Sequence, residues 1–171
     1  YATYSGVTWG IDNVSVPEEK KDIVKNARKE EEIVRGQFED GLLSEEEQQQ
    51  KVIEIWERAN NEIKKVIPGT LDKTGSTYDL ITSGARGNLN HLSQMCGMKG
   101  IIVNTSGEAL DFPVIPSYLE GLSPLEYFIT THGSRKGAAD TALNTAKAGY
   151  LTRRLVDVAQ DVMITEEDCG T

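Results

Sequence analysis

The sequence predicts a mainly α-helical chain that forms part of a larger multidomain protein. Two neighbouring segments with helical apolar spacing predict an antiparallel helical hairpin, and a third such segment is unusually long. Between them lie a glycine-arginine loop and a small β-hairpin. We therefore divide the chain into a region with the helical hairpin (1–75), a loop and β-hairpin region (76–122), a long helix (123–161) and a short acidic end (162–171).

The first helix of the hairpin is predicted at about residues 17–38. Pro17 and the acidic residues Glu18 and Glu19 suit the start of a helix, where proline loses no hydrogen bond and acids face the positive end of the dipole. The apolar stripe of this helix consists of Ile23, Ala27, Val34 and Phe38. The run Asp40-Gly41-Leu42-Leu43 ends it.

The second helix is predicted at about residues 45–67. Ser44 and Glu47 have the spacing of a capping box, and Pro68-Gly69 is expected to end the helix. The apolar residues follow steps of four and three, typical of a heptad seam, at Val52, Trp56, Ala59, Ile63 and Val66. Each helix would be roughly 30 Å long. The other faces are charged, so the hairpin is either a coiled-coil spacer or a docking arm.

The next region contains Ser83-Gly84-Ala85-Arg86-Gly87, one arginine between two glycines. Glycine permits backbone conformations closed to other residues, and a guanidinium is a fork suited to phosphate, although many such turns bind nothing. Residues 101–118 form two short apolar runs around Thr105-Ser106-Gly107, which predicts a small strand pair.

A long helix is predicted from Pro124 to Asp161, about 57 Å at about 1.5 Å per residue. Ser123 and Glu126 supply a second capping box, with proline at the first helical position. Three interior glycines each cost about 1 kcal/mol of helix propensity. Glycine is explained there either by close packing or by bending. These glycines are Gly133, Gly137 and Gly149.

Charge is unevenly distributed along the chain, whose net charge is −9. Residues 123–158 alone are net positive, with 5 basic and 3 acidic residues. Local charge decides whether phosphates can approach, so the long helix is the candidate nucleic-acid contact. No apolar run nears the roughly 20 residues that span a membrane, and the two cysteines form no disulfide framework. The first residue, Tyr1, and the acidic end suggest a piece of a longer chain.

These segments together resemble the largest catalytic subunit of multisubunit RNA polymerase, the bacterial beta-prime type. Residues 130–161, TTHGSRKGAADTALNTAKAGYLTRRLVDVAQD, resemble its bridge helix, and SGARG resembles the start of its F-loop. Gln94, Gly97, Met98 and Gly100 match the family pattern Q-x-x-G-M-x-G. The order of hairpin, loop and long helix also matches. The resemblance implies a part of the subunit that lines the active-site cleft and the secondary channel for nucleotide entry.

The resemblance also implies roles for particular residues. Arg86 would bind the triphosphate of the incoming nucleotide, and the three glycines of the long helix would act as hinges. Channel-entering regulatory factors would dock at the hairpin tip, on Phe38, Glu39, Asp40 and Leu42. The residues expected to face the cleft and its nucleic acid are Arg135, Lys136, Thr145, Ala146, Tyr150, Arg153 and Arg154.

The match has departures from the family pattern. Bacterial relatives usually carry glutamine, arginine, leucine and alanine where this chain has His91, Ser93, Met95 and Cys96. The serine removes an expected second basic contact from the loop. Asn144 stands where many relatives have lysine, which removes another positive charge.

No catalytic residue is expected within this chain. The family holds its magnesium with the motif NADFDGD, which is absent here, so the isolated chain should bind no cofactor and make no RNA. Cys169 would be one of four zinc thiolates, and only in the full subunit, because one thiolate cannot form a tetrahedral site.

The resemblance further implies partners and a location. The partners are the beta, alpha, omega and sigma subunits, the DNA template, the RNA–DNA hybrid, nucleoside triphosphates and channel-binding transcription factors, with no membrane. The location would be the bacterial cytoplasm, at the nucleoid, or a plastid.

Two alternatives of other classes remain at this point: a free-standing helical interaction module and a small enzyme that uses His132. On one helix His132 and Asp140 lie about 12 Å apart along the axis, too far to hydrogen-bond. His91 and Cys96 could share a metal, but a buried thiol is the commoner role for Cys96.

Overall fold

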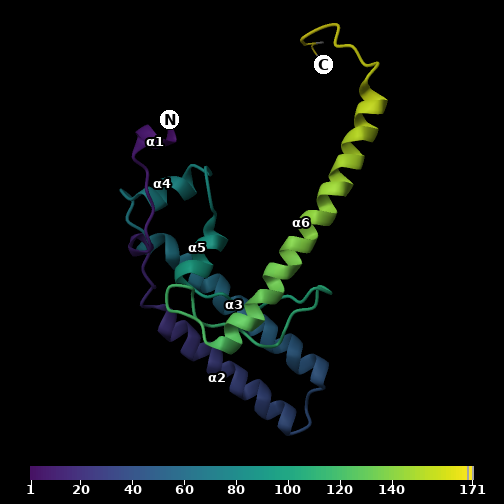
Figure 1. Ribbon diagram of the computed structural model, residues 1–171. Helices are drawn as coiled ribbons and strands as arrows, with labels where there is room; N and C mark the ends of the chain where they lie inside the picture. The colour runs from purple at the N-terminus through teal and green to yellow at the C-terminus, as the bar shows by residue number, and fades with distance from the viewer. Residues whose placement is uncertain (169, 171) are drawn as a thin grey trace. The chain divides into compact units, whose positions relative to one another are not determined.

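The computed structural model describes residues 1–168 and Gly170 (Figure 1). These residues are mainly α-helical, as predicted, and fall into two compact units, residues 1–133 and 134–171. The last helix belongs to both units. The helical elements are α1 (Ala2–Ser5), the 3-10 helix η1 (Ile11–Asn13), α2 (Lys20–Glu39), α3 (Glu45–Thr70), α4 (Ser76–Thr82), α5 (Leu89–Cys96) and α6 (Pro124–Ala159).

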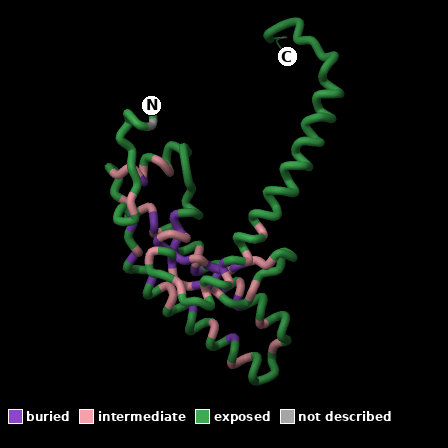
Figure 2. Tube along the Cα trace, viewed as in Figure 1, coloured by how far each residue is buried: buried purple, intermediate pink, exposed green. Residues whose placement is uncertain are grey.

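Helices α2 and α3 form the predicted antiparallel hairpin, and most of the buried positions lie along α3 and the elements packed on it (Figure 2). The first helix begins three residues later than predicted. Pro17 starts a turn instead, in which the Lys20 N–H donates to the Pro17 carbonyl at 3.3 Å. At the centre of the hairpin the Trp56 ring is fully buried, and its Nε1–H donates to Glu31 Oε2 at 3.1 Å.

The buried seam of α3 departs from the predicted heptad at its end. Val66 is only half-buried, and Ile67 is fully buried in its place. A straight helix drifts by about 20° per heptad, so the inward position moves one residue onward. Ile55 is also buried. On α2 the stripe loses its last member, because Phe38 is exposed.

The capping box that starts α3 is confirmed. The Ser44 N–H donates to Glu47 Oε2 at 2.9 Å, and the Glu47 N–H donates to Ser44 Oγ at 3.3 Å. The Ser44 backbone N–H, with its hydroxyl, lowers the pKa of the Glu47 carboxyl. The predicted end at Pro68 is wrong, because α3 continues to Thr70. Proline cannot donate to the carbonyl four residues earlier and crowds it, yet the helix continues for two residues past Pro68. The Thr70 hydroxyl donates to the Ile67 carbonyl at 2.9 Å in that final turn.

Residues 76–122 contain two short helices, α4 and α5, that the sequence prediction left as loop. The predicted strand pair is reduced to two isolated antiparallel bridges, Gly100–Val114 and Val103–Ala109, and no continuous strand forms among the described residues. Proline has no N–H to donate to a ladder, and Pro113 and Pro116 flank the first bridge. The pairing therefore stays antiparallel without becoming a hairpin of strands.

The segment that follows α5 packs against α3 through glycine. A Cβ added at Gly97 would lie 2.8 Å from the Ser93 carbonyl oxygen and 2.9 Å from the side chains of Ile63 and Ile67. Met98 is fully buried beside them. Gly100 has φ +83°, and its added Cβ would lie 2.9 Å from Asn60 Nδ2. Close backbone approach thus explains this glycine-methionine-glycine run physically.

Helix α6 starts as predicted and ends at Ala159, two residues before the predicted end. The Ser123 N–H donates to Glu126 Oε2 at 2.8 Å, and the Glu126 N–H donates to Ser123 Oγ at 3.3 Å. Within the first unit, Thr130 is buried and Gly133 approaches Ile102. In the second unit the described residues are exposed, apart from half-buried Lys136.

Candidate functional site

The predicted phosphate-binding arginine lies in the loop between α4 and α5. Gly84 and Gly87 have φ +69° and +77°, left-handed conformations that favour glycine, so both glycines of the motif are required by the turn. The Arg86 N–H donates to the Leu80 carbonyl at 3.4 Å, which holds the loop against α4. The Arg86 side chain is exposed and has no ion pair within the described part of the chain, so its guanidinium is available to an anion.

Arg86 also borders a shallow hollow of about 200 Å³ that sequence reasoning missed. Trp9 and Ile81 line the hollow together with His91 and Met95. Trp9 is 77 residues from Arg86, and no local pattern links the two positions. The hollow places apolar side chains beside the arginine.

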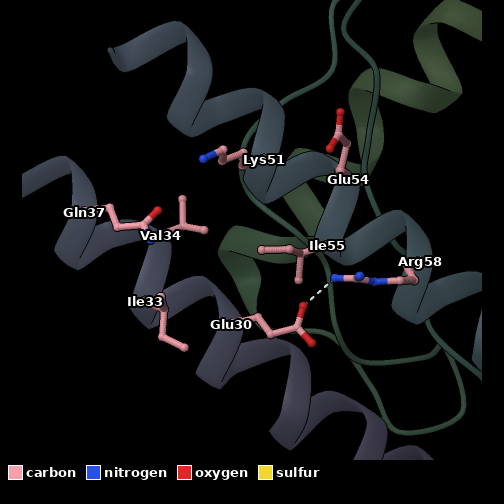
Figure 3. Close-up of a pocket in the computed structure, with 8 residues that line it drawn as sticks. All are labelled: Glu30, Ile33, Val34, Gln37, Lys51, Glu54, Ile55 and Arg58. Atoms are coloured by element: carbon pink, nitrogen blue, oxygen red, sulfur yellow. Dashed lines mark hydrogen bonds and ion pairs between the residues drawn. The ribbon is translucent and has the colours of Figure 1, made fainter. Parts of the chain in front are cut away.

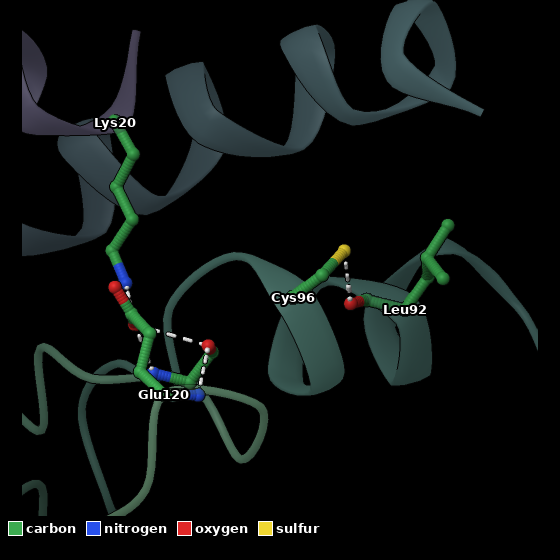
Figure 4. A network of polar contacts seen from close by, with 5 residues as sticks. Lys20, Leu92, Cys96 and Glu120 are labelled. Atoms are coloured by element: carbon green, nitrogen blue, oxygen red, sulfur yellow. Dashed lines mark hydrogen bonds and ion pairs between the residues drawn. The ribbon is translucent and has the colours of Figure 1, made fainter. Parts of the chain in front are cut away.

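The residues that depart from the family pattern differ in how far they are buried. His91 is exposed, whereas Ser93 is buried and its hydroxyl donates to Asn60 Oδ1 at 3.4 Å. Cys96 is a buried thiol, as predicted, and donates to the Leu92 carbonyl at 3.2 Å (Figure 4). Burial raises the pKa of this thiol, which favours the uncharged form.

Among the described residues no group of three or more histidine, cysteine or acidic side chains could hold a metal ion. Cys169 lies outside the described residues.

Four of the residues expected to face the cleft share one face of α6. At about 100° per residue, Arg135, Ala146, Tyr150 and Arg153 lie within about 60° of one another around the helix. Lys136 and Arg154 lie at one flank of this face. Thr145 lies at the other flank, and its hydroxyl donates to the Thr141 carbonyl at 2.7 Å.

The basic residues of α6 differ in how they are already paired. Lys136 Nζ lies 3.6 Å from Asp140 Oδ2, and Arg153 Nε lies 3.9 Å from Asp157 Oδ2. The central guanidinium carbon of Arg154 lies over the Tyr150 ring, 4.8 Å from the ring centroid. Arg135 has no ion pair among the described residues. Exposed pairs of this kind are weak, so a phosphate could displace them at little cost.

The hairpin tip presents apolar and acidic groups together. Phe38 and Leu42 are exposed, Leu42 by 72%, and Glu39 and Asp40 are exposed between them. A surface groove of about 520 Å³ also runs between the two hairpin helices (Figure 3). It is lined by Glu30, Ile33, Val34, Gln37, Lys51, Glu54, Ile55 and Arg58. The Glu30–Arg58 ion pair crosses the groove.

His132 does not pair with Asp140, as a catalytic triad built on this histidine would require. Its ring packs edge-to-face on Phe128, with centroids 5.8 Å apart, and Asp140 is paired with Lys136 instead. The structure therefore gives the small-enzyme alternative no support. No described helix combines the length and the apolar character that crossing a membrane requires.

A helical hairpin, an arginine loop and a long basic helix follow one another in this chain, in the order expected from its resemblance to the largest subunit of multisubunit RNA polymerases. Residues 26–121 match the family model described as RNA polymerase Rpb1, domain 4, and residues 121–171 match RNA polymerase Rpb1, domain 5. Since the first match alone covers more than half of the chain, the chain belongs to this RNA polymerase family.

The chain is similar to bacterial proteins named DNA-directed RNA polymerase subunit beta'. It is 49% identical over all 171 residues to that of Desulforamulus reducens, and 51% identical to those of Pelotomaculum thermopropionicum and Streptomyces avermitilis. It spans 14%, 15% and 13% of their respective lengths. The predicted beta-prime resemblance is thus confirmed, and a free-standing interaction module is not favoured.

Proposed function

We propose that the chain is part of the catalytic subunit of a DNA-dependent RNA polymerase and lines the active-site cleft and nucleotide-entry channel during transcription. The observation that carries the proposal is the identity of about half, over all 171 residues, to beta' subunits. The exposed apolar side chains of α6 agree with it. Leu143, Leu151 and Leu155 are each at least half exposed and would be covered by the rest of such a subunit.

Arg86 is proposed to bind the triphosphate of the incoming nucleotide. A guanidinium can donate two parallel hydrogen bonds to phosphate oxygens, and such charge-assisted bonds are roughly twice as strong as neutral ones. The glycines on both sides hold the arginine on a tight turn with an open approach. The contact would orient the nucleotide and stabilise negative charge as the phosphate bond breaks.

Helix α6 is proposed to border the template base and the RNA–DNA hybrid. Ala146 and Thr145 are small, which allows a base to approach the helix closely, while Arg135 and Arg153 on the same side would contact phosphates or the mobile trigger loop. The Tyr150 ring offers a stacking surface. The catalytic magnesium and the zinc would be held by residues that are mostly outside this chain, with Cys169 as one zinc ligand in the full subunit.

The proposed partners follow from that placement. They are the beta, alpha, omega and sigma subunits, the DNA template and hybrid, nucleoside triphosphates, and regulatory factors that enter the channel and dock at the hairpin tip. The proposed location is the bacterial nucleoid or a plastid.

A chimeric subunit tests the proposed function. When this chain replaces the matching segment of the Desulforamulus reducens beta' subunit, we expect assembled polymerase to retain templated RNA synthesis within about tenfold, or about 1.4 kcal/mol. The isolated chain should incorporate no nucleotide. The control is the same chimera with residues 134–159 in scrambled order, which should assemble without synthesis. An assembled but inactive unscrambled chimera would contradict the proposal.

The α6 glycines give a second prediction. In α6 an alanine Cβ at Gly137 meets nothing within 4 Å in this chain, so the added methyl should stabilise the helix by about 1 kcal/mol. If Gly137 is a hinge, Gly137→Ala should change elongation rate or pausing in the assembled enzyme. Gly36→Ala in α2 is the matched control, because Gly36 is helical and equally open. Equal rates for both variants and the parent enzyme would remove the hinge role.

The hairpin tip gives a third prediction. Leu42→Asp should weaken binding of a purified channel-entering factor at least tenfold, because burying a leucine side chain contributes about 1.5–3 kcal/mol. Basal elongation should not change. Ile33→Asp is the control, since Ile33 is similarly exposed on the side of the same hairpin. Comparable loss of binding in both variants would place the factor on the groove rather than the tip.

A further inference from the structure

Lys20, the first residue of α2, is a buried lysine that has one charged partner in the part of the chain that the structure describes. Only 4% of the residue is exposed, and its ammonium donates to the carboxylate of Glu120, one hundred positions along the chain (Figure 4). Lysine is almost never this buried unless it is paired. The contact therefore joins the base of the hairpin to the segment that precedes α6.

Glu120 is held in place from its own side. The Ser117 N–H and hydroxyl donate to Glu120 Oε2 at 2.8 and 3.0 Å, and the Glu120 N–H lies 3.4 Å from Ser117 Oγ. Ser117 is fully buried. Burial acts to raise the pKa of Glu120, but the hydrogen bonds from Lys20 and Ser117 outweigh it and lower the pKa. The Glu120 carboxyl is thus ionised at neutral pH, and Ser117 fixes the position of its Oε2 atom.

The carboxylate sits immediately before the start of α6. Gly121, with φ +87°, turns the chain directly after Glu120, and the Ser123 cap begins the helix two residues later. The same segment is tied to α5, because the Tyr118 and Leu119 N–H groups donate to the Gln94 and Met95 carbonyls at 3.1 and 3.0 Å. Those backbone bonds hold the segment to α5, and among the described residues the Lys20–Glu120 ion pair is the one that joins it to α2.

Stability alone does not account for such a pair. Replacing a buried ion pair with apolar side chains of similar volume is often neutral or stabilising, because both charges must leave water. What the pair adds is a limit on position: Ser117 fixes the Glu120 carboxylate, and the Lys20 ammonium must reach it, so the two backbones stay within one lysine side-chain length of each other. An apolar contact has no such preferred partner atom.

We propose that Lys20 and Glu120 are positioning residues that set where α6 begins relative to the base of the hairpin. The proposal rests on the proposed function, because α6 is taken to border the template base. Losing the contact should lower the maximal rate of nucleotide addition. The Km for nucleotide should stay constant, since the backbone hydrogen bond that holds the Arg86 loop, from the Arg86 N–H to the Leu80 carbonyl, involves neither side chain.

The test uses assembled polymerase that carries this chain, with elongation rates counted per active complex. Lys20→Met and Glu120→Gln should each reduce the maximal rate at least threefold and leave the nucleotide Km within twofold. The double variant should be no slower than the slower single variant, because both changes remove one contact. Arg58→Met is the control: it breaks an exposed ion pair of the same hairpin and should leave both parameters unchanged.

A structural role would reduce the number of active complexes and leave the rate per complex unchanged, and that result overturns the proposal. So does a raised Km at constant maximal rate, or additive effects in the double variant. Glu120→Asp covers the case in which the other variants do not assemble: it keeps the charge but withdraws the carboxylate from Lys20, so it should also slow addition. An unchanged rate for Glu120→Asp overturns the proposal. If the parent chimera itself is inactive, the proposed function fails instead.

Discussion

Arg86→Ala is expected to lower kcat/Km for nucleotide incorporation by about 10- to 150-fold in an assembled polymerase, with a raised nucleotide Km. The estimate follows from the loss of about 1.5–3 kcal/mol when a charge-assisted hydrogen bond is removed. The guanidinium is exposed and has no ion pair among the described residues, so its removal should not disturb the fold. Single-nucleotide addition measured over a range of nucleotide concentrations gives both parameters.

Two further variants define what the arginine contributes. Arg86→Lys keeps the charge but loses the two-pronged donor geometry, so it should recover only part of the activity. Arg28→Ala removes an exposed arginine from α2 and should have no effect. If Arg86→Ala incorporated nucleotide like the parent enzyme, Arg86 would be an ordinary turn residue and its loop would have no substrate role.

Gly97→Ala is expected to reduce the free energy of unfolding of the chain by about 1–3 kcal/mol, the usual cost of forcing extra volume into a packed core. The new Cβ would lie 2.8 Å from the Ser93 carbonyl oxygen, a backbone atom that cannot turn aside. It would also press on Ile63 and Ile67. Urea unfolding followed by the fluorescence of buried Trp56 measures the change, with a constant m-value as the sign that the compact state is otherwise intact.

The control for this prediction is Gly69→Ala in α3, where an added Cβ meets nothing within 4 Å. That variant should be no less stable than the parent chain, because alanine favours the helix. Adding Ile67→Val to Gly97→Ala removes one clashing methyl group and should restore part of the loss, while the carbonyl contact persists. Equal stability of Gly97→Ala and Gly69→Ala would show that the α3–α5 contact can expand without cost.

The sequence by itself determined the three long helices and the starts of α3 and α6. Ser44 with Glu47, and Ser123 with Glu126, form the predicted capping boxes because each involves residues only three apart, and local chain geometry brings them together. The approximate length of α6 was likewise predicted from the apolar spacing along that one segment. Residues 130–161, the SGARG loop and the glycine-methionine-glycine run carried the resemblance to the polymerase family, which the comparisons confirm.

The tertiary structure decided everything that depends on which distant segments meet. Whether Val66 or Ile67 faces inward depends on how α3 packs, and the two isolated bridges near Val114 depend on prolines that interrupt the ladder. Trp9 beside Arg86 and Lys20 on Glu120 join positions that no periodic pattern relates. Burial and charge pairing are properties of the assembled surfaces, so local sequence signals cannot specify them.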